Sequence, residues 1–206
     1  MAVRGKFITF EGPDDVGKST HTGLLAEVLH GRYGHEVLVL GLPSRGPVGI
    51  YIRSDMHLLS WPVAALAFAA DRAIQTETVI EPALGAGKTV LCDRYLLSGL
   101  VYSCARAGSL DHLRWLQDIE RRATVPDLTL VMVNSEGTAA SHRVDRREPS
   151  QYDRDRALQD RVRGLYLTDM AKFIPGHPYS RVSSDGSIEQ VAGSILGALQ
   201  GHGLIP

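Results

Sequence analysis

The chain has few cysteines, no long apolar run and almost no net charge, and each of these absences excludes a class of protein. Cys92 and Cys104 are its two cysteines among 206 residues, so neither a disulfide framework nor a cysteine-based metal site is expected. The longest apolar stretch, residues 62–70, is far too short to span a bilayer. A formal net charge of -1 provides no overall field that would select nucleic acid or an anionic membrane.

We expect no secretory signal, because a strand pattern begins within a few residues of Met1. Hydrophobic residues make up 44% of the chain and charged residues 22%, which is typical of an ordinary globular domain. We therefore expect one cytoplasmic domain over residues 1–206.

Lysine is also scarce, since only four of the 22 basic residues are lysines. A lysine at a motif position is therefore less easily explained by chance. Lys18 lies in the segment GPDDVGKST, residues 12–20, which fits the phosphate-binding pattern G-x-x-x-x-G-K-S/T.

Short apolar runs rich in β-branched residues alternate with segments of helical periodicity. We expect strands at residues 6–10, 36–40, 88–92, 128–133 and 179–183. Helical patterns cover residues 18–32, 62–86 and 110–123, and a last helix starts at a capping box formed by Ser187 and Gln190. Because the strands are almost continuously apolar, the pattern predicts a parallel sheet covered by helices on both faces.

The glycine-rich segment lies between the first strand and the first helix, which is the context that a phosphate-binding loop requires. Its glycines let the backbone wrap an anion, and the first N–H groups of the helix point at it. Lys18 is expected to reach the β- and γ-phosphates of ATP, and the Ser19 hydroxyl to bind Mg²⁺. The predicted ATP-binding residues of the loop are Gly12, Asp15, Val16, Gly17, Lys18, Ser19 and Thr20. The alternative is an ordinary glycine-rich turn.

Asp93 and Arg94 follow the third predicted strand and so lie at the carboxyl edge of the sheet, where open α/β folds bind ligands. Asp93 is a second candidate for Mg²⁺, and Arg94 is a candidate for bridging the transferred phosphate and the acceptor phosphate. A strand-end salt bridge is the alternative interpretation of this pair.

Residues 134–163 are polar and rich in arginine. Arg143, Arg146 and Arg147 have the spacing of one helix face, but acidic residues are interleaved with the run. The segment is therefore either a solvated, salt-bridged helix or a lid that brings arginines onto the phosphates.

Several segments in order along the chain resemble the thymidylate kinase family over nearly its whole length. They are FEG before the phosphate loop, residues 43–53, FAADR at 68–72, VIEPAL at 79–84, DRY at 93–95, SG at 98–99, PDLTL at 126–130, VRGLYL at 162–167 and SIE at 187–189. The resemblance implies a three-layer P-loop NTPase fold of α/β class, with strand order 2-3-1-4-5 and a lid over residues 134–163. It also implies Mg²⁺-dependent transfer of the ATP γ-phosphate to dTMP, and a homodimer.

The resemblance assigns roles to individual residues. Phe68 would stack on the pyrimidine, Arg72 would donate to the base O4, and Asp14 would accept from the sugar 3′-hydroxyl. Ser184, Asp185 and Gly186 would border the adenine, and Arg143 would be the catalytic arginine of the lid. The implied catalytic residues are Lys18, Asp93, Arg94 and Arg143, and the substrate-binding residues are Asp14, Pro43, Arg53, Phe68, Arg72, Arg94, Ser98, Tyr102 and Tyr152. Taken alone, Phe68 would be a core aromatic residue; Arg72, one turn along the same face, favours the pocket.

The chain departs from the family pattern at several positions. Gly41-Leu42 replaces an Arg-Glu pair, Ser103 replaces a glutamine, Asn134 replaces an acidic residue, and Asp15 occupies a site where some relatives have a catalytic arginine. An arginine from the lid would then have to supply the missing charge.

These departures leave phosphate transfer as the predicted class and the acceptor base open. A kinase for a modified pyrimidine or another nucleotide is one alternative, and a nucleotide-binding regulator without activity is another. We expect no nucleic-acid partner, because the arginine run is interleaved with acids and the aromatic residues form no stacking platform.

Overall fold

The computed structural model describes residues 3–135 and 155–206, and in these ranges five parallel strands form one sheet. The strand order is β2-β3-β1-β4-β5, which confirms the order expected from the family resemblance. The strands are β1 (Phe7–Glu11), β2 (Val37–Gly41), β3 (Thr89–Asp93), β4 (Leu128–Val133) and β5 (Tyr179–Ser183). The predicted strands are all present, and β4 and β5 have the predicted bounds.

The first three strands each extend one residue further toward the carboxyl edge than their apolar runs. Glu11, Gly41 and Asp93 continue the ladders, with Gly41 paired to Asp93 and Glu11 paired to Val131. Polar or small residues at these ends carry no hydrophobic signal, which is why the sequence pattern omits them. Their placement brings two carboxylates to the edge where the site lies.

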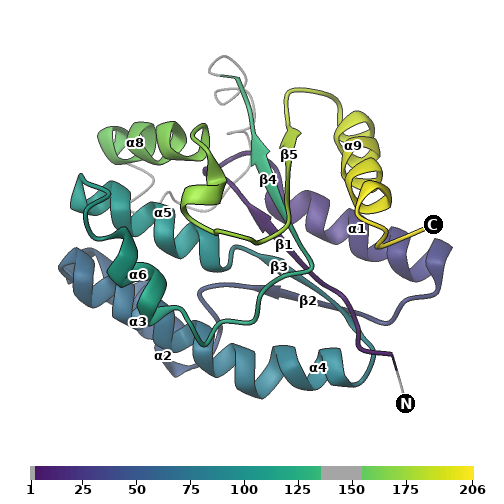
Figure 1. Cartoon of the computed structure of the whole chain (residues 1–206), viewed down its shortest axis with the longest axis horizontal. Coiled ribbons are helices and arrows are strands. Elements are labelled where there is room, and N and C mark those ends of the chain that lie inside the picture. Colours follow the sequence, from purple (N-terminus) through teal and green to yellow (C-terminus); the bar gives the residue numbers. More distant parts are fainter. Residues whose placement is uncertain (1–2, 136–154) are drawn as a thin grey trace.

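Helices cover both faces of the sheet and give the molecule its three layers (Figure 1). One face packs against α1 (Lys18–Tyr33) and α9 (Ile188–Gly201). The elements of the other side are α2 (Pro47–Asp55), η1 (Met56–Leu58), α3 (Trp61–Gln75), η2 (Thr76–Ile80), α4 (Glu81–Gly85), α5 (Leu96–Ala107), α6 (Leu113–Ile119), α8 (Arg156–Tyr166) and η4 (Met170–Lys172). A hydrophobic core lies on each face of the sheet. Successive side chains of the inner strands point alternately into one core and the other, as Val90 and Leu91 do in β3.

The helical pattern at residues 62–86 is one continuous run, but it is not one α-helix. Between α3 and α4, residues Thr76–Ile80 form a π turn. Thr76 is buried there, and its hydroxyl hydrogen-bonds the Tyr95 hydroxyl at 2.9 Å. This hydrogen bond links the π turn to Tyr95, the residue immediately before α5.

The helix predicted at residues 110–123 is shorter than its pattern, because α6 covers only Leu113–Ile119. The backbone then tightens, with Ala123 N donating to Glu120 O at 2.9 Å. This turn directs the Glu120 side chain into the core, where it pairs with Arg72. The capping box at the start of α9 is present as predicted, with Ser187 and Gln190 bonded reciprocally. No helix in the described ranges is long and apolar enough to cross a membrane.

Candidate active site

The loop between β1 and α1 has the backbone conformations that its glycines predict. Gly12 has φ 146° and Gly17 has φ 82°, both in the region that favours glycine. A Cβ on Gly12 would overlap the carbonyl oxygen of Met132, so the close approach of the loop to β4 also requires a glycine. Asp15 adopts a positive φ of 62° without being glycine. The loop is thus held in a compact shape that leads directly into α1.

Lys18 is the first residue of α1, and its side chain is almost fully buried within the loop. Its ammonium donates to the Pro13 carbonyl oxygen at 2.5 Å. Burial and the nearby Arg94 cation lower the pKa of Lys18 to about 7, against the opposing effect of Asp14 and Asp93. Anionic oxygens placed beside this ammonium would raise its pKa and favour its charged form.

Ser19 and Asp93 meet beside Lys18, although they are 74 residues apart in the chain. The Ser19 hydroxyl donates to Asp93 Oδ2 at 2.5 Å, and Asp93 Oδ1 is buried with no hydrogen-bond partner among the described residues. Hydroxyl and carboxylate oxygens are donors that Mg²⁺ prefers, with phosphates and water completing its shell. The two residues therefore fit the metal-binding role predicted for them.

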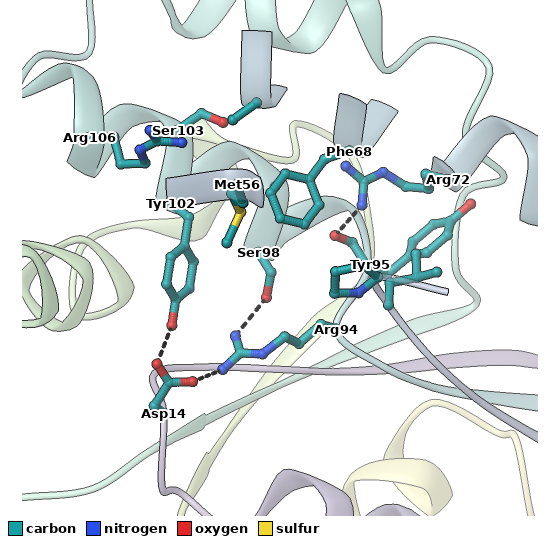
Figure 2. A pocket seen from close by; sticks show the side chains of 14 residues that line it. Asp14, Met56, Phe68, Arg72, Arg94, Tyr95, Ser98, Tyr102, Ser103 and Arg106 are labelled. Carbon is teal, nitrogen blue, oxygen red and sulfur yellow. Dashed lines mark hydrogen bonds and ion pairs between the residues drawn. The ribbon is translucent and has the colours of Figure 1, made fainter. Parts of the chain in front are cut away.

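Arg94 projects from the end of β3 across the mouth of the phosphate loop (Figure 2). Its Nη2 forms an ion pair with Asp14, and its Nη1 donates to the Gly12 carbonyl at 3.1 Å and to Ser98 Oγ at 3.2 Å. The residue adopts a positive φ of 66°, an uncommon conformation for arginine. The strand-end salt bridge considered for Asp93 and Arg94 is not what forms, because the carboxylate partner of Arg94 is Asp14.

Asp14 collects donors from three different elements. Besides Arg94, it accepts from the Tyr102 hydroxyl at 3.1 Å and from Gln159 Nε2 of α8 at 3.0 Å. Burial alone would raise the pKa of Asp14, but the charges of Arg94 and Lys18 outweigh burial and lower it. Gln159 was not predicted as a site residue, since a single glutamine on an amphipathic helix carries no motif.

A mostly apolar pocket opens beside Asp14 and Arg94 (Figure 2). It lies between α3, α5 and the loop after β2, and Phe68 projects into it from α3. Its lining residues are Asp14, Leu42, Pro43, Met56, Ala64, Phe68, Arg72, Arg94, Tyr95, Ser98, Gly99, Tyr102, Ser103 and Arg106. Most of the predicted substrate-binding residues are in this set. The lining residues that were not predicted as site residues are Leu42, Met56, Ala64, Tyr95, Gly99, Ser103 and Arg106.

Arg72 lines the pocket while being almost entirely enclosed by protein, at 1% exposure. Its Nε and Nη2 donate to the two oxygens of Glu120 at 2.8 and 2.5 Å, and its Nη1 donates to the Tyr95 carbonyl at 2.8 Å. A guanidinium has five N–H donors, so one hydrogen on each terminal nitrogen is left for a ligand. Gly99 lies against Nη2, and a Cβ there would overlap it. Glycine at this position is what admits the guanidinium.

Arg53 does not line the pocket. Its guanidinium donates to the carbonyl oxygens of Pro43 and Ser44 in the loop after β2. Asp71 holds the same loop from α3, accepting from Ser44 N at 2.6 Å and from Ser44 Oγ at 2.5 Å. A phosphate-binding role for Arg53 therefore remains a prediction.

Comparison with known proteins agrees with this geometry. The family model described as "Thymidylate kinase" matches residues 10–195. The chain belongs to the thymidylate kinase family. A probable thymidylate kinase of Thermococcus kodakarensis is 35% identical over 205 residues, covering 94% of this chain and 97% of that protein. A thymidylate kinase of Clavibacter michiganensis is 40% identical over 176 residues, covering 80% and 81%.

A solved thymidylate kinase structure from Candida albicans superposes with a TM-score of 0.78 at 22% identity, covering 98% of this chain and 93% of that one. At this identity the match supports the fold. Together with the sheet order, it places this member of the thymidylate kinase family among P-loop α/β proteins.

The predicted adenine-binding loop connects β5 to α9, at the same edge of the sheet as the phosphate loop. Ser184 is buried and donates to the Val133 carbonyl at 3.2 Å. Asp185 accepts from Ser135 N at 2.8 Å, which fastens the chain after β4 to this loop. Contact of Ser184, Asp185 and Gly186 with adenine stays a prediction.

The lid expected for this family falls mostly outside the described residues, and with it Arg143, Arg146, Arg147, Tyr152 and Arg154. From residue 155 onward the segment is described, and α8 packs on α5 through Leu158, Val162 and Tyr166.

Two arginines of α8 do not form the mutually paired set that is one of the two alternatives for this segment. Arg161, although exposed, donates through Nε to the Ala105 carbonyl at 2.9 Å, and Arg163 donates to Asn134 Oδ1 at 2.7 Å. These bonds anchor α8 to α5 and to the end of β4.

Proposed function

We propose that this chain catalyses transfer of the γ-phosphate of ATP to the 5′-phosphate of dTMP, giving ADP and dTDP. The decisive observation is that the phosphate loop and the apolar pocket meet at one ion pair, Arg94 with Asp14. The loop accounts for an anionic donor, and the pocket accounts for a flat apolar base with a few polar groups. Their shared edge supports a transfer between two nucleotides rather than simple hydrolysis.

The residues suit a reaction that depends on position and charge. Lys18 would neutralise part of the charge on the β- and γ-phosphates. Ser19 and Asp93 would hold Mg²⁺, which would neutralise further negative charge on the phosphate oxygens. Arg94 would leave Asp14 to bind the acceptor phosphate, and Asp14 would then be available to the sugar hydroxyl. No general base is required, because the acceptor oxygen is already ionised at neutral pH.

In the base pocket, Phe68 would stack on the pyrimidine, and the remaining hydrogens of Arg72 would reach the O4 atom. The loop holding Pro43, together with Arg53 of α2, would close the phosphate side, and Tyr152 would cover the sugar. Because Asp15 stands where some relatives have an arginine, we assign the additional transition-state cation to Arg143 of the lid.

We further propose a cytoplasmic homodimer formed through α2 and α3. Val63, Leu66 and Ile74 form a stripe along α3 and are 49%, 49% and 45% exposed. Ile50 and Tyr51 of the neighbouring α2 are 58% and 46% exposed. Large apolar side chains gathered on adjacent helices are typical of a surface that a second subunit covers.

Coupled ADP release with ATP and Mg²⁺ against dTMP, dUMP, UMP, CMP and dGMP tests the activity. We expect turnover with dTMP to exceed that with the other acceptors. A preference for another acceptor would identify a kinase for a different nucleotide. Binding of ATP with no ADP formed in the presence of any of these acceptors would indicate a regulator and overturn the proposal. Light scattering during gel filtration tests the dimer, and Leu66→Glu should yield monomers.

A further inference from the structure

Glu11 is a buried carboxylate that the proposed reaction does not use directly. It ends β1 immediately before the phosphate loop and is only 1% exposed. Oε1 accepts from the backbone N–H groups of Tyr95 at 2.9 Å and Leu97 at 3.0 Å. Oε2 accepts from Ser98 N at 3.0 Å and also from the Ser98 hydroxyl. Within the described ranges it forms no ion pair, and its charge is offset by these donors and by the more distant cations Arg94 and Arg72.

Through these contacts Glu11, the last residue of β1, caps the N-terminus of α5. The residue before α5, Tyr95, makes no side-chain capping bond, so the first N–H groups of the helix need an acceptor from elsewhere. A carboxylate at a helix N-terminus is favoured by both the hydrogen bonds and the helix dipole. Glu11 therefore fixes the start of α5. It also helps to hold the positive φ of Arg94, because the N–H of Arg94 donates to Phe10 O at 2.9 Å and the next N–H, of Tyr95, donates to Glu11.

The Ser98 hydroxyl continues this arrangement to the guanidinium. A hydroxyl has one hydrogen and two lone pairs. Ser98 gives its hydrogen to Glu11, accepts from Arg94 Nη1 at 3.2 Å, and lies 3.0 Å from the Tyr166 hydroxyl. Its capacity is filled by the protein, although Ser98 also lines the pocket as predicted. A hydrogen-bonded path thus runs from Glu11 through Ser98 to Arg94.

We propose that Glu11 is a positioning residue for phosphoryl transfer, which orients Arg94 through Ser98 and the start of α5. The inference rests on the proposed function, because Arg94 is assigned to the acceptor phosphate there. Burial raises the pKa of Glu11, opposed by Ser98, Arg94 and the Tyr95 backbone. The three backbone N–H groups can only donate, so these bonds favour the ionised form of the carboxylate.

Glu11→Gln tests the path, because the amide keeps the size but presents an NH₂ group to donors. We expect kcat to fall about 10–100-fold and KM for dTMP to rise, while KM for ATP stays within about threefold. Ser98→Ala, which keeps the backbone cap, should reproduce much of the loss in kcat. Tyr166→Phe is the matched control, since it removes a bond to Ser98 but leaves the path to Arg94, and its kcat should be close to wild type.

A double-mutant comparison separates positioning from a general structural role. If Glu11 acts through Arg94, Glu11→Gln should lower kcat very little when Arg94→Ala is already present. Equal losses in both backgrounds would overturn the inference, as would wild-type kcat in both Glu11→Gln and Ser98→Ala.

Calorimetric binding of dTMP to the same variants gives a readout that is independent of turnover, and the inference requires weaker binding in Glu11→Gln than in Tyr166→Phe. If the wild-type chain released no ADP with any acceptor, the proposed function would be wrong. The comparison of dTMP binding between Glu11→Gln and Tyr166→Phe would still test the role of Glu11, because it does not depend on turnover.

Discussion

Gly99→Ala is expected to displace the buried Arg72, which we propose recognises the base, by adding one methyl group. Alanine in a helix is normally more stable than glycine by about 0.5–1 kcal/mol. Here the Cβ would overlap Arg72 Nη2 and lie 3.3 Å from its Cζ and 3.5 Å from Glu120 Oε1. Both partners of this ion pair are almost fully enclosed, so neither can move into solvent.

The expected loss of stability follows from the buried ion pair between Arg72 and Glu120 that the methyl group would separate. Breaking a buried ion pair typically costs about 3–5 kcal/mol, because a buried charge is left uncompensated. After subtracting the helical gain of alanine, the free energy of unfolding should fall by about 2–4 kcal/mol. For a chain of this size that corresponds to a decrease in Tm of roughly 5–15 °C. KM for dTMP should rise while KM for ATP changes little.

Urea and thermal unfolding measure the effect, with Gly197→Ala as the control. Gly197 lies in α9, and a Cβ there would meet nothing within 4 Å. The control should therefore be as stable as wild type or slightly more stable. If Gly99→Ala were as stable as wild type and bound dTMP normally, the Arg72 side chain would have to move aside without losing its contacts. That result would refute the conclusion that Arg72 is held rigidly in its buried position.

Further predictions concern the phosphate site, the lid and the thiols. Lys18→Ala should lower kcat by about 10²–10³-fold or more without unfolding the chain, as measured by ADP release and circular dichroism. Arg72→Ala should weaken dTMP binding in titrations and leave the affinity for a non-hydrolysable ATP analogue unchanged; equal losses would make it purely structural. Arg143→Ala should strongly reduce the single-turnover rate, and a normal rate would remove it from the mechanism. Burial raises the pKa of Cys104 to about 11 and that of Cys92 well above 9.0, so thiol-reactive dye should label the native chain very slowly at pH 8. Because these pKa values are raised, their contribution to stability is present below about pH 9 and is lost as the pH rises through about 11, which urea unfolding at several pH values will show.

Local sequence rules predict the phosphate loop and the sheet well, because their causes are local. Gly12 and Gly17 are required by their own backbone angles, and apolar runs of β-branched residues define the strands. The capping box of Ser187 and Gln190 is likewise set by neighbouring residues. The pocket residues from Asp14 to Tyr102 were identified by family resemblance, and no local rule would have assembled them.

Several of the residues that sequence reasoning missed are buried carboxylates whose partners are distant in the chain. Glu11 bonds to residues 84 to 87 positions away, Glu120 to Arg72 at 48 positions, and Asp71 to Ser44 at 27 positions. Each acid lies beside an ordinary apolar pattern, and only the packing of separate elements shows that it is enclosed. Such partners follow from tertiary structure rather than from periodicity.

The π turn between α3 and α4 sets how many residues the helical run from α3 to α4 must contain. Arg72, Thr76, Ile80 and Leu84 are all buried at intervals of four residues. In an α-helix each such interval drifts by about 40°, so Leu84 would lie about 120° away from Arg72. The wider turn at Thr76–Ile80 removes most of that drift and keeps both residues on the buried side. The run thus contains one residue more than three α-helical turns require. Deleting one residue from 76–80 would leave Leu84 facing the sheet, whereas the same deletion within α3 would turn everything after it by about 100°.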